Sequence, residues 1–465
     1  MDRPTTIGSL RASGWQSRPV KHEVRANAIA RIAASEPLVD GVLGYEDTVL
    51  PQLENALLAG HDVIFLGERG QAKTRMIRTL TNLLDEFMPI VAGSEINDDP
   101  YAPVSAPARA AVAELGDDTP IEWVGRDLRY GEKLATPDTS IADLIGEVDP
   151  IKVAEGRYLS DELTLHYGLV PRTNRGIFAI NELPDLSERI QVGLLNVLEE
   201  RDVQVRGYKI RLPLDVMLVA SANPEDYTNR GRIITPLKDR FGSQIRTHYP
   251  LDVEAEVRVI EQEMVVPDAP GVTVYVPRFM TEIVAGISQL ARRSPHINQR
   301  SGVSVRLSIA NAETLVANAL RRSLRSGETD VVPRVVDLDA LVASTAGKVE
   351  LEMLDDGREE QVLDRLVKAS VLETFGDRVP AEHIGALVKS FDGDLVIETG
   401  ESVPVGAYTA LLGIVPGMRE AVAPLEPGES PAAIASAIEL VLEGLHLTKR
   451  LNKDAAAGGA TYSGR

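Results

Sequence analysis

The chain has 465 residues, of which 44% are hydrophobic and 25% are charged, and this composition is typical of globular proteins. A chain of this length predicts about two to four domains. Acidic residues outnumber basic ones by 69 to 49, and the net charge of −20 disfavours binding to nucleic acid or to anionic lipid. The absence of cysteine excludes disulfides, thiolate catalysis, zinc fingers and iron–sulfur clusters.

Residues 1–37 carry more basic than acidic side chains and no apolar segment typical of a secretory signal. We expect them to form a flexible, solvated N-terminal arm that leads into a helix. An alternative is a strap that docks on an acidic neighbouring subunit. No apolar stretch of about 18 residues occurs, so we expect no membrane insertion and a cytoplasmic protein.

Strand and helix signals alternate from residue 38 to residue 252. Short apolar runs predict buried parallel strands at residues 61–66, 176–180 and 216–221. Helices are expected at residues 50–58 and 76–87 and in a segment ending at 199, and alternation around Gly207 predicts a hairpin at 203–213. This order predicts an α/β fold with a mostly parallel sheet.

Helical periodicity dominates after residue 252. Helices are expected near residues 254–264, 279–292, 307–324 and 338–346, and Ser430 and Pro431 predict the start of another that runs to about 451. The Ala- and Gly-rich tail is expected to be disordered. The predicted domains are the arm at 1–37, an α/β core at 38–252, a helical lid at 253–352 and a mostly helical C-terminal region at 353–465.

The string GERGQAKT lies between a predicted strand and a predicted helix and nearly fits the phosphate-loop pattern G-x-x-x-x-G-K-[ST]. In such a loop the backbone N–H groups surround a phosphate. Lys73 would contact the β- and γ-phosphates, and the Thr74 hydroxyl would help to hold Mg²⁺. Ala72 replaces the last glycine, which costs little if its φ is negative. A turn that needs glycine for steric reasons is the alternative. The predicted phosphate-binding residues are Gly67, Glu68, Arg69, Gly70, Gln71, Ala72, Lys73 and Thr74.

Asn181 and Glu182 follow the predicted strand at residues 176–180. In nucleoside triphosphatases this place holds a carboxylate that orients Mg²⁺, then a Glu that polarises the attacking water. Glu182 fits the second role, whereas Asn181 stands where Asp is usual. An amide oxygen can still hold a Mg²⁺-bound water. A polar strand end before a loop is the alternative.

Three further polar residues lie where they could complete such a site. Asn223 ends the predicted strand at 216–221 and could position the water, although it could also be a turn residue before Pro224. Arg240 could act as an arginine finger in an adjacent subunit, or pair with Asp239. Arg306 opens a predicted helix and could reach the γ-phosphate, or simply lie on the surface.

These five elements, in this order, resemble an AAA+ ATPase. The closer resemblance is to the magnesium chelatase I subunit and the MoxR-like ATPases, and it covers roughly residues 38–350. It rests on GERGQAKT, on LIGEVDP at 144–150, on the segment at 157–186 with its GIFAINELPDL end, and on the segment at 194–226 with its LVASANPED end. GVLGYEDT at 41–48 resembles the stretch that packs around adenine, which assigns Leu43, Gly44 and Tyr45 to the nucleotide.

The resemblance implies ATP and Mg²⁺ as cofactors, a hexameric ring with Arg240 acting on the neighbouring subunit, and a partner with a von Willebrand-type domain. It implies an ATP-hydrolysing motor that remodels a partner protein or drives metal insertion or complex assembly. Two alternatives remain open. One is an activator ATPase for the alternative sigma factor, which the segment at 176–207 also resembles. The other is a nucleotide-gated scaffold with little hydrolysis, which Asn181 would favour.

Overall fold

The computed structural model describes residues 3–148, 165–199, 202–204, 211–223, 232–299, 302–351, 359–456 and 458–465. The chain forms two compact units, Met1–His248 and Tyr249–Arg465. The boundary between the units lies within a few residues of the predicted end of the core. Part of the predicted hairpin lies outside the described residues. So do parts of the segments at 144–150, 157–186 and 194–226, on which the family resemblance rests.

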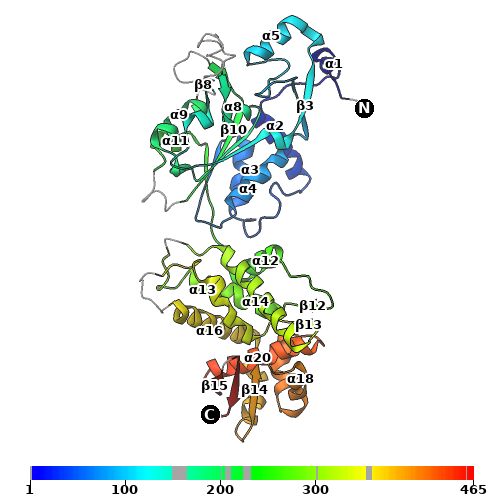
Figure 1. The fold of residues 1–465 in the computed structure, drawn as a ribbon, viewed down its shortest axis with the longest axis vertical. Coiled ribbons are helices and arrows are strands. Elements are labelled where there is room, and N and C mark those ends of the chain that lie inside the picture. Colours follow the sequence, from blue (N-terminus) through cyan, green and yellow to red (C-terminus); the bar gives the residue numbers. More distant parts are fainter. Residues whose placement is uncertain are drawn as a thin grey trace. The chain divides into compact units, whose positions relative to one another are not determined.

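The first unit contains the predicted parallel sheet (Figure 1). Its five strands lie in the order β11 (Ser243–Arg246), β1 (Val63–Leu66), β10 (Val216–Ala222), β7 (Gly176–Asn181) and β4 (Tyr130–Leu134). All four neighbouring pairs are parallel. The predicted α/β fold class is therefore confirmed.

Helices cover both faces of this sheet, and the strand side chains alternate between the two faces. Val63 and Phe65 belong to one apolar cluster, whereas Ile64 and Leu66 belong to another. The first cluster includes residues of α2 (Val20–Ala33), α3 (Val49–Ala59) and α4 (Lys73–Thr79), and the second includes residues of α9 (Glu188–Glu199) and α11 (Thr235–Arg240). Burial on both faces explains why the strands read as continuous apolar runs.

The expectation of a flexible arm at residues 1–37 is wrong, because the described part of this segment is folded onto the first unit. It contains α1 (Ile7–Ala12) and α2 (Val20–Ala33). Val20, Val24 and Ala28 are buried, and their four-residue spacing gives α2 an apolar face. Both carboxylate oxygens of Glu23 accept hydrogen bonds from the buried Arg129 guanidinium, at 2.7 and 2.6 Å. The prediction of a solvated arm relied on the excess of basic side chains in this segment and did not take its apolar helix face into account.

The predicted helix at 76–87 ends earlier than expected. Helix α4 stops at Thr79, a 3₁₀ turn covers Leu80–Leu83, and the strand β2 (Phe87–Val91) follows. The other described elements of this unit are β3 (Ile121–Gly125), paired with β2, α5 (Ala106–Leu115), α6 (Ile141–Leu144), β5 (Gly146–Val148), β6 (Leu165–Tyr167), α8 (Leu169–Arg172), β8 (Asp202–Gln204) and β9 (Arg211–Pro213). Strands β8 and β9 pair antiparallel, as expected for the hairpin.

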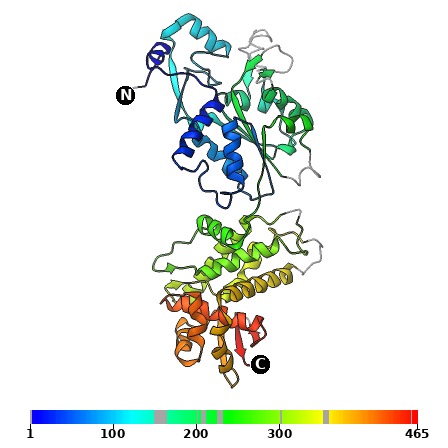
Figure 2. The same cartoon turned by 180° about the vertical axis from the view of Figure 1, so that it is seen from behind.

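The second unit is mostly helical (Figure 2). It has one main apolar core. This core contains residues from both the predicted lid and the predicted C-terminal region, so these two regions share one core. Its helices are α12 (Val253–Glu263), α13 (Arg278–Ala291), α14 (Val305–Ser326), α15 (Leu341–Thr345), α16 (Glu359–Arg378), α17 (Gly385–Ser390), α18 (Val405–Ile414), α19 (Met418–Val422) and α20 (Pro431–Leu447), and a short parallel pair joins β12 (Thr273–Val274) to β13 (Asp330–Val331).

The expectation of a disordered tail is also wrong for the described residues. Strands β15 (Asn452–Ala456) and β16 (Gly459–Ser463) pair with each other, and β16 also pairs with β14 (Val396–Gly400). Ala460 and Tyr462 alternate along β16 and are buried in the core of the second unit. Two apolar side chains at strand spacing therefore order a segment whose Ala and Gly content looks disordered. Among the described residues, no helix is long and apolar enough to cross a membrane.

Candidate functional site

Three neighbouring strands of the first unit end at one edge of the sheet. Leu66 of β1 lies opposite Ala222 of β10, and Ala220 of β10 lies opposite Ile180 of β7. Because the strands are parallel, the loop starting at Gly67, the pair Asn181–Glu182 and Asn223 all leave the sheet on the same side. Open α/β sheets bind ligands outside the carboxyl ends of their strands. The structure therefore brings these predicted residues together.

Gly67 begins the candidate phosphate loop in a place with no room for a side chain. A Cβ there would lie 1.9 Å from the Thr247 hydroxyl oxygen and 2.2 Å from the Gln71 side-chain oxygen. These two oxygens lie 2.6 Å apart, because the Thr247 hydroxyl donates to Gln71. The start of the loop thus lies against the end of β11, and a side chain at position 67 would displace the side chains of Thr247 and Gln71.

Lys73 begins α4 and is 6% exposed. Its ammonium group donates hydrogen bonds to the backbone carbonyls of Gly67 and Glu68, at 2.7 Å for Glu68. The charge therefore lies inside the curve of the loop, where a phosphate loop would need it. Thr74, the next residue, is half-buried.

Ala72 departs from the expectation that its φ is negative. Its φ is +54°, in the left-handed region. This conformation costs a non-glycine residue roughly 1–2 kcal/mol. The glycine of the phosphate-loop pattern thus corresponds to a real conformational demand, which this chain meets with a strained alanine.

Tyr45 joins three segments around the loop. Its hydroxyl group lies 3.0 Å from the Gln71 carbonyl oxygen and 2.7 Å from the His248 carbonyl oxygen. Burial raises the pKa of Tyr45 to about 12, so this hydroxyl keeps its proton. The predicted adenine-side segment is therefore fastened to the phosphate loop, with the half-buried Leu43 and Gly44 beside Tyr45.

Asn181 ends β7 with its side chain held on both sides. Its amide nitrogen donates to Glu132 Oε1 at 2.6 Å, and its amide oxygen accepts from the Ser221 hydroxyl at 3.2 Å. Glu132 lies on β4 and Ser221 on β10, the two strands that flank β7. The sequence analysis did not find either partner, because neither belongs to a recognisable motif.

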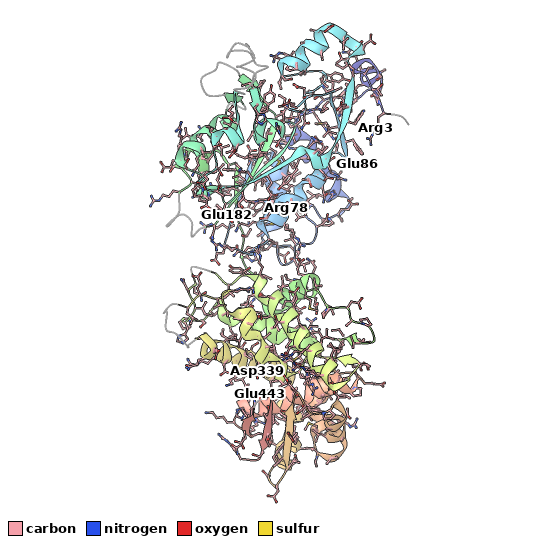
Figure 3. The ribbon with its side chains drawn as sticks, viewed as in Figure 1. Arg3, Arg78, Glu86, Glu182, Asp339 and Glu443 are labelled. Atoms are coloured by element: carbon pink, nitrogen blue, oxygen red, sulfur yellow. The ribbon has the colours of Figure 1, made fainter. Side chains whose placement is uncertain are left out.

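Glu132 is itself held by a cation on the helix that follows the loop. Arg78 donates to Glu132 from Nε at 2.8 Å and from a terminal nitrogen at 2.9 Å, and the Tyr130 hydroxyl also donates at 2.9 Å. The hydrogen bonds from Arg78 lower the pKa of Glu132, so this carboxyl is ionised at neutral pH. Arg78 and Glu182 are labelled in Figure 3.

Glu182 has a φ of +54°, which is uncommon for a residue other than glycine. Its backbone N–H donates to the Ser221 hydroxyl at 3.3 Å, and its side chain is half-buried. Backbone strain of this kind is concentrated at functional sites. Asn223, at the end of β10, is 1% exposed.

Arg240 lies apart from this group, and Arg306 belongs to the second unit. Arg240 is exposed at the end of α11 and lies 3.4 Å from Asp239. It comes just before β11, whose first residue Ser243 lies opposite Val63, so it is at the amino edge of the sheet and the phosphate loop is at the other edge. Arg306 is exposed near the start of α14, in the second unit.

The donor atoms at the carboxyl edge suit a hard cation. Thr74 offers a hydroxyl, Asn181 an amide oxygen and Glu182 a carboxylate, and Mg²⁺ prefers such oxygen ligands together with water and phosphate. Within the described residues, no group of three or more His, Cys, Asp or Glu side chains could hold a metal by itself. The residues therefore fit Mg²⁺ that arrives with a nucleotide.

Comparison with known proteins gives a consistent result. The family model for the Sigma-54 interaction domain matches residues 155–240. The magnesium-chelatase subunit ChlI of Nostoc sp. (strain PCC 7120) is 28% identical over 360 residues, which cover 71% of this chain and 90% of that protein. The magnesium-chelatase 38 kDa subunit of Cereibacter sphaeroides is 32% identical over 203 residues, which cover 43% of this chain and 54% of that protein.

Among solved structures, a model of the complex between the magnesium chelatase subunits BchI and BchD is 22% identical. The match covers 70% of this chain and 98% of that one. Its TM-score is 0.36, and no structural argument is drawn from it. The curated proteins that the chain resembles over most of its length are magnesium-chelatase ChlI subunits.

Proposed function

We propose that this protein binds ATP with Mg²⁺ at the carboxyl edge of its parallel sheet and uses hydrolysis to remodel a partner protein. The observation that carries the proposal is the convergence, at one sheet edge, of the Lys73 loop with Asn181, Glu182 and Asn223. The fastening of Tyr45 to Gln71 supports a place for the adenine beside the same loop.

Each residue has a role that its position allows. The loop N–H groups and Lys73 bind the phosphates, and the Thr74 hydroxyl and the Asn181 amide oxygen hold the metal or its waters. Glu182 accepts a proton from the attacking water, and Asn223 orients that water. Mg²⁺, when bound, neutralises charge on the β- and γ-phosphate oxygens.

The proposal includes a ring, most simply a hexamer, in which Arg240 acts on the nucleotide of the neighbouring subunit. The position of Arg240 at the amino edge supports this, since it cannot serve the loop of its own sheet. The role proposed for Arg306 is to contact a γ-phosphate.

The relatives are magnesium-chelatase subunits, which supports a client that inserts a metal or assembles in a comparable way. We propose a partner protein with a von Willebrand-type domain, as in the chelatase and MoxR-like systems that the motifs resemble, and a cytoplasmic location. The match of residues 155–240 to the Sigma-54 interaction domain favours a second candidate, an activator of the alternative sigma factor. The net charge of −20 speaks against the DNA binding that such an activator needs.

The test is to measure ATP binding and ATP turnover in the wild type and in Glu182→Gln. The variant should still bind ATP but turn it over roughly 10²–10⁴-fold more slowly, the usual loss for a positioned acid–base group. Glu188→Gln is the matched control, because Glu188 is exposed at the first position of α9. An unchanged rate in Glu182→Gln, or equal losses in both variants, would remove Glu182 from the mechanism.

A further inference from the structure

The Asn181 amide has a fixed orientation across the sheet. The strand order β1, β10, β7, β4 places Asn181 between Ser221 on the side of β1 and Glu132 on the other side. Its oxygen accepts from Ser221, and its nitrogen donates to Glu132. The amide oxygen is therefore turned toward the strand that carries the phosphate loop, and the nitrogen is turned away from it.

The chemistry of the partners determines this orientation. A carboxylate oxygen accepts hydrogen bonds, and Glu132 accordingly faces the amide nitrogen of Asn181. Arg78 donates to both oxygens of Glu132. The Ser221 hydroxyl can donate to the amide oxygen that then faces it. A neutral amide at position 132 could accept from the Asn181 nitrogen or donate to the Asn181 oxygen, so it would not fix the orientation.

The same contact explains why Asn stands at position 181. An Asp there has no donor and would place a second carboxylate against Glu132, at the 2.6 Å that now separates the amide nitrogen from Glu132 Oε1. Two carboxylates at such a distance repel each other. The residue types at positions 181 and 132 therefore depend on each other. The carboxylate of this pair is Glu132 on β4, and the amide is Asn181 on β7.

We infer that Glu132 is a positioning residue of the Mg²⁺–nucleotide site, which acts by turning the Asn181 oxygen toward the metal. This inference rests on the proposed function. Glu132 is suited to the role, since its side chain is 21% exposed, whereas that of its partner Arg78 is 62% exposed. A solvent-exposed ion pair alone would contribute little, and the inward contact to Asn181 sets Glu132 apart.

The experiment compares the wild type with Glu132→Gln, Asn181→Asp and the double variant. The first measurement is the ratio of fluorescent ADP affinity with Mg²⁺ to that with EDTA. Loss of an outer partner of a metal ligand costs roughly 10–100-fold in metal affinity, so Glu132→Gln should lower this ratio at least about tenfold. Asp127→Asn, an exposed carboxylate just before β4, is the control and should leave the ratio unchanged.

The second measurement is thermal melting without nucleotide at pH 7. Asn181→Asp should melt below the wild type, because the hydrogen bond from position 181 to Glu132 is lost and the two facing carboxylates repel each other. In the double variant the hydrogen bond reverses, because the glutamine side chain donates to the aspartate. The melting temperature should recover relative to Asn181→Asp, and the Mg²⁺ preference should recover relative to Glu132→Gln.

The outcomes separate the two claims. A normal Mg²⁺ preference in Glu132→Gln, or a double variant no better than Asn181→Asp, would overturn the positioning role while the nucleotide site stands. Absence of nucleotide binding by the wild type would overturn the proposed function, and the metal-site role of Glu132 with it.

Discussion

Two ion-paired groups, one in each unit, lie in different surroundings. In the second unit, Asp337 and Arg322 are joined at 3.0 Å and are 0% and 3% exposed. In the first unit, Arg78 and Glu132 are joined at 2.8 Å, and Arg78 is largely exposed. One pair is enclosed by protein, and the other lies near the sheet edge where the phosphate loop begins.

The buried carboxylate of Asp337 in the second unit has its hydrogen-bond donors within the same unit. Asp337 accepts hydrogen bonds from Asn318, from Arg322 and from the backbone of Arg334. Glu439 nearby accepts from the Tyr408 hydroxyl at 2.6 Å, and burial raises the pKa of this carboxyl. These residues connect α14 and α20 to the 3₁₀ turn that precedes α15. Their contacts therefore stabilise the fold of the second unit.

The group in the first unit spans strand ends instead of enclosing a core. Its members hold the amide of Asn181, and next to it stand Glu182, with strained backbone, and the buried Lys73. The comparison teaches that burial of charge alone does not mark a functional site. The convergence of polar groups on a sheet edge, together with backbone strain, does.

The largest effect is expected from Arg240→Ala. An arginine finger contributes roughly 10³–10⁵-fold to turnover, so the variant should lose nearly all ATPase activity while still binding nucleotide. Mixing it with Lys73→Ala subunits should restore part of the rate, since each supplies what the other lacks. Mixed rings that form but show no recovery would mean that the site in the first unit is complete within one subunit.

Asp337→Asn tests the enclosed group. Removing one partner of a buried ion pair leaves the other uncompensated and costs about 3–5 kcal/mol. Urea unfolding should show this loss in the transition of the second unit, with ATP affinity of the folded protein unchanged. Asp392→Asn, an exposed carboxylate in the same unit, is the control. A loss of ATP affinity without a loss of stability would reverse the roles assigned to the two groups.

The smallest effect is expected from Ala72→Gly. Glycine adopts positive φ without strain but loses more freedom on folding, so the net gain in unfolding free energy should be about 0.5–1 kcal/mol. Ala110→Gly, at an exposed position inside α5, should have the opposite sign and cost about 1 kcal/mol. Destabilisation by both substitutions would show that the left-handed conformation of Ala72 is not a source of strain.

The sequence was informative where one local pattern determines one structure. The apolar runs at Val63–Leu66 and Gly176–Asn181 predicted buried strands, because both of their faces are covered. The phosphate-loop pattern predicted a loop between a strand and a helix, and the structure has this loop between β1 and α4, with Lys73 at the start of the helix. These features depend on neighbours in the chain, so spacing reveals them.

The features that sequence analysis missed depend on contacts between distant segments. Glu132 meets Asn181 only because β4 and β7 are neighbours in the sheet. The helix α2 is fixed by Glu23 and Arg129, 106 positions apart. Tyr462 orders the tail because it reaches the core of the second unit. Composition gave no sign of these partners.

The most direct test of the central claim is a titration of the wild type and Lys73→Ala with fluorescent ATP in the presence of Mg²⁺. The account predicts tight binding to the wild type and a loss of roughly 100-fold or more in folded Lys73→Ala, because Lys73 supplies the phosphate-binding charge inside the loop. Lys389→Ala, an exposed lysine of α17, should bind as the wild type does. Equal affinity in the wild type and Lys73→Ala would contradict the assignment of the nucleotide site to this loop.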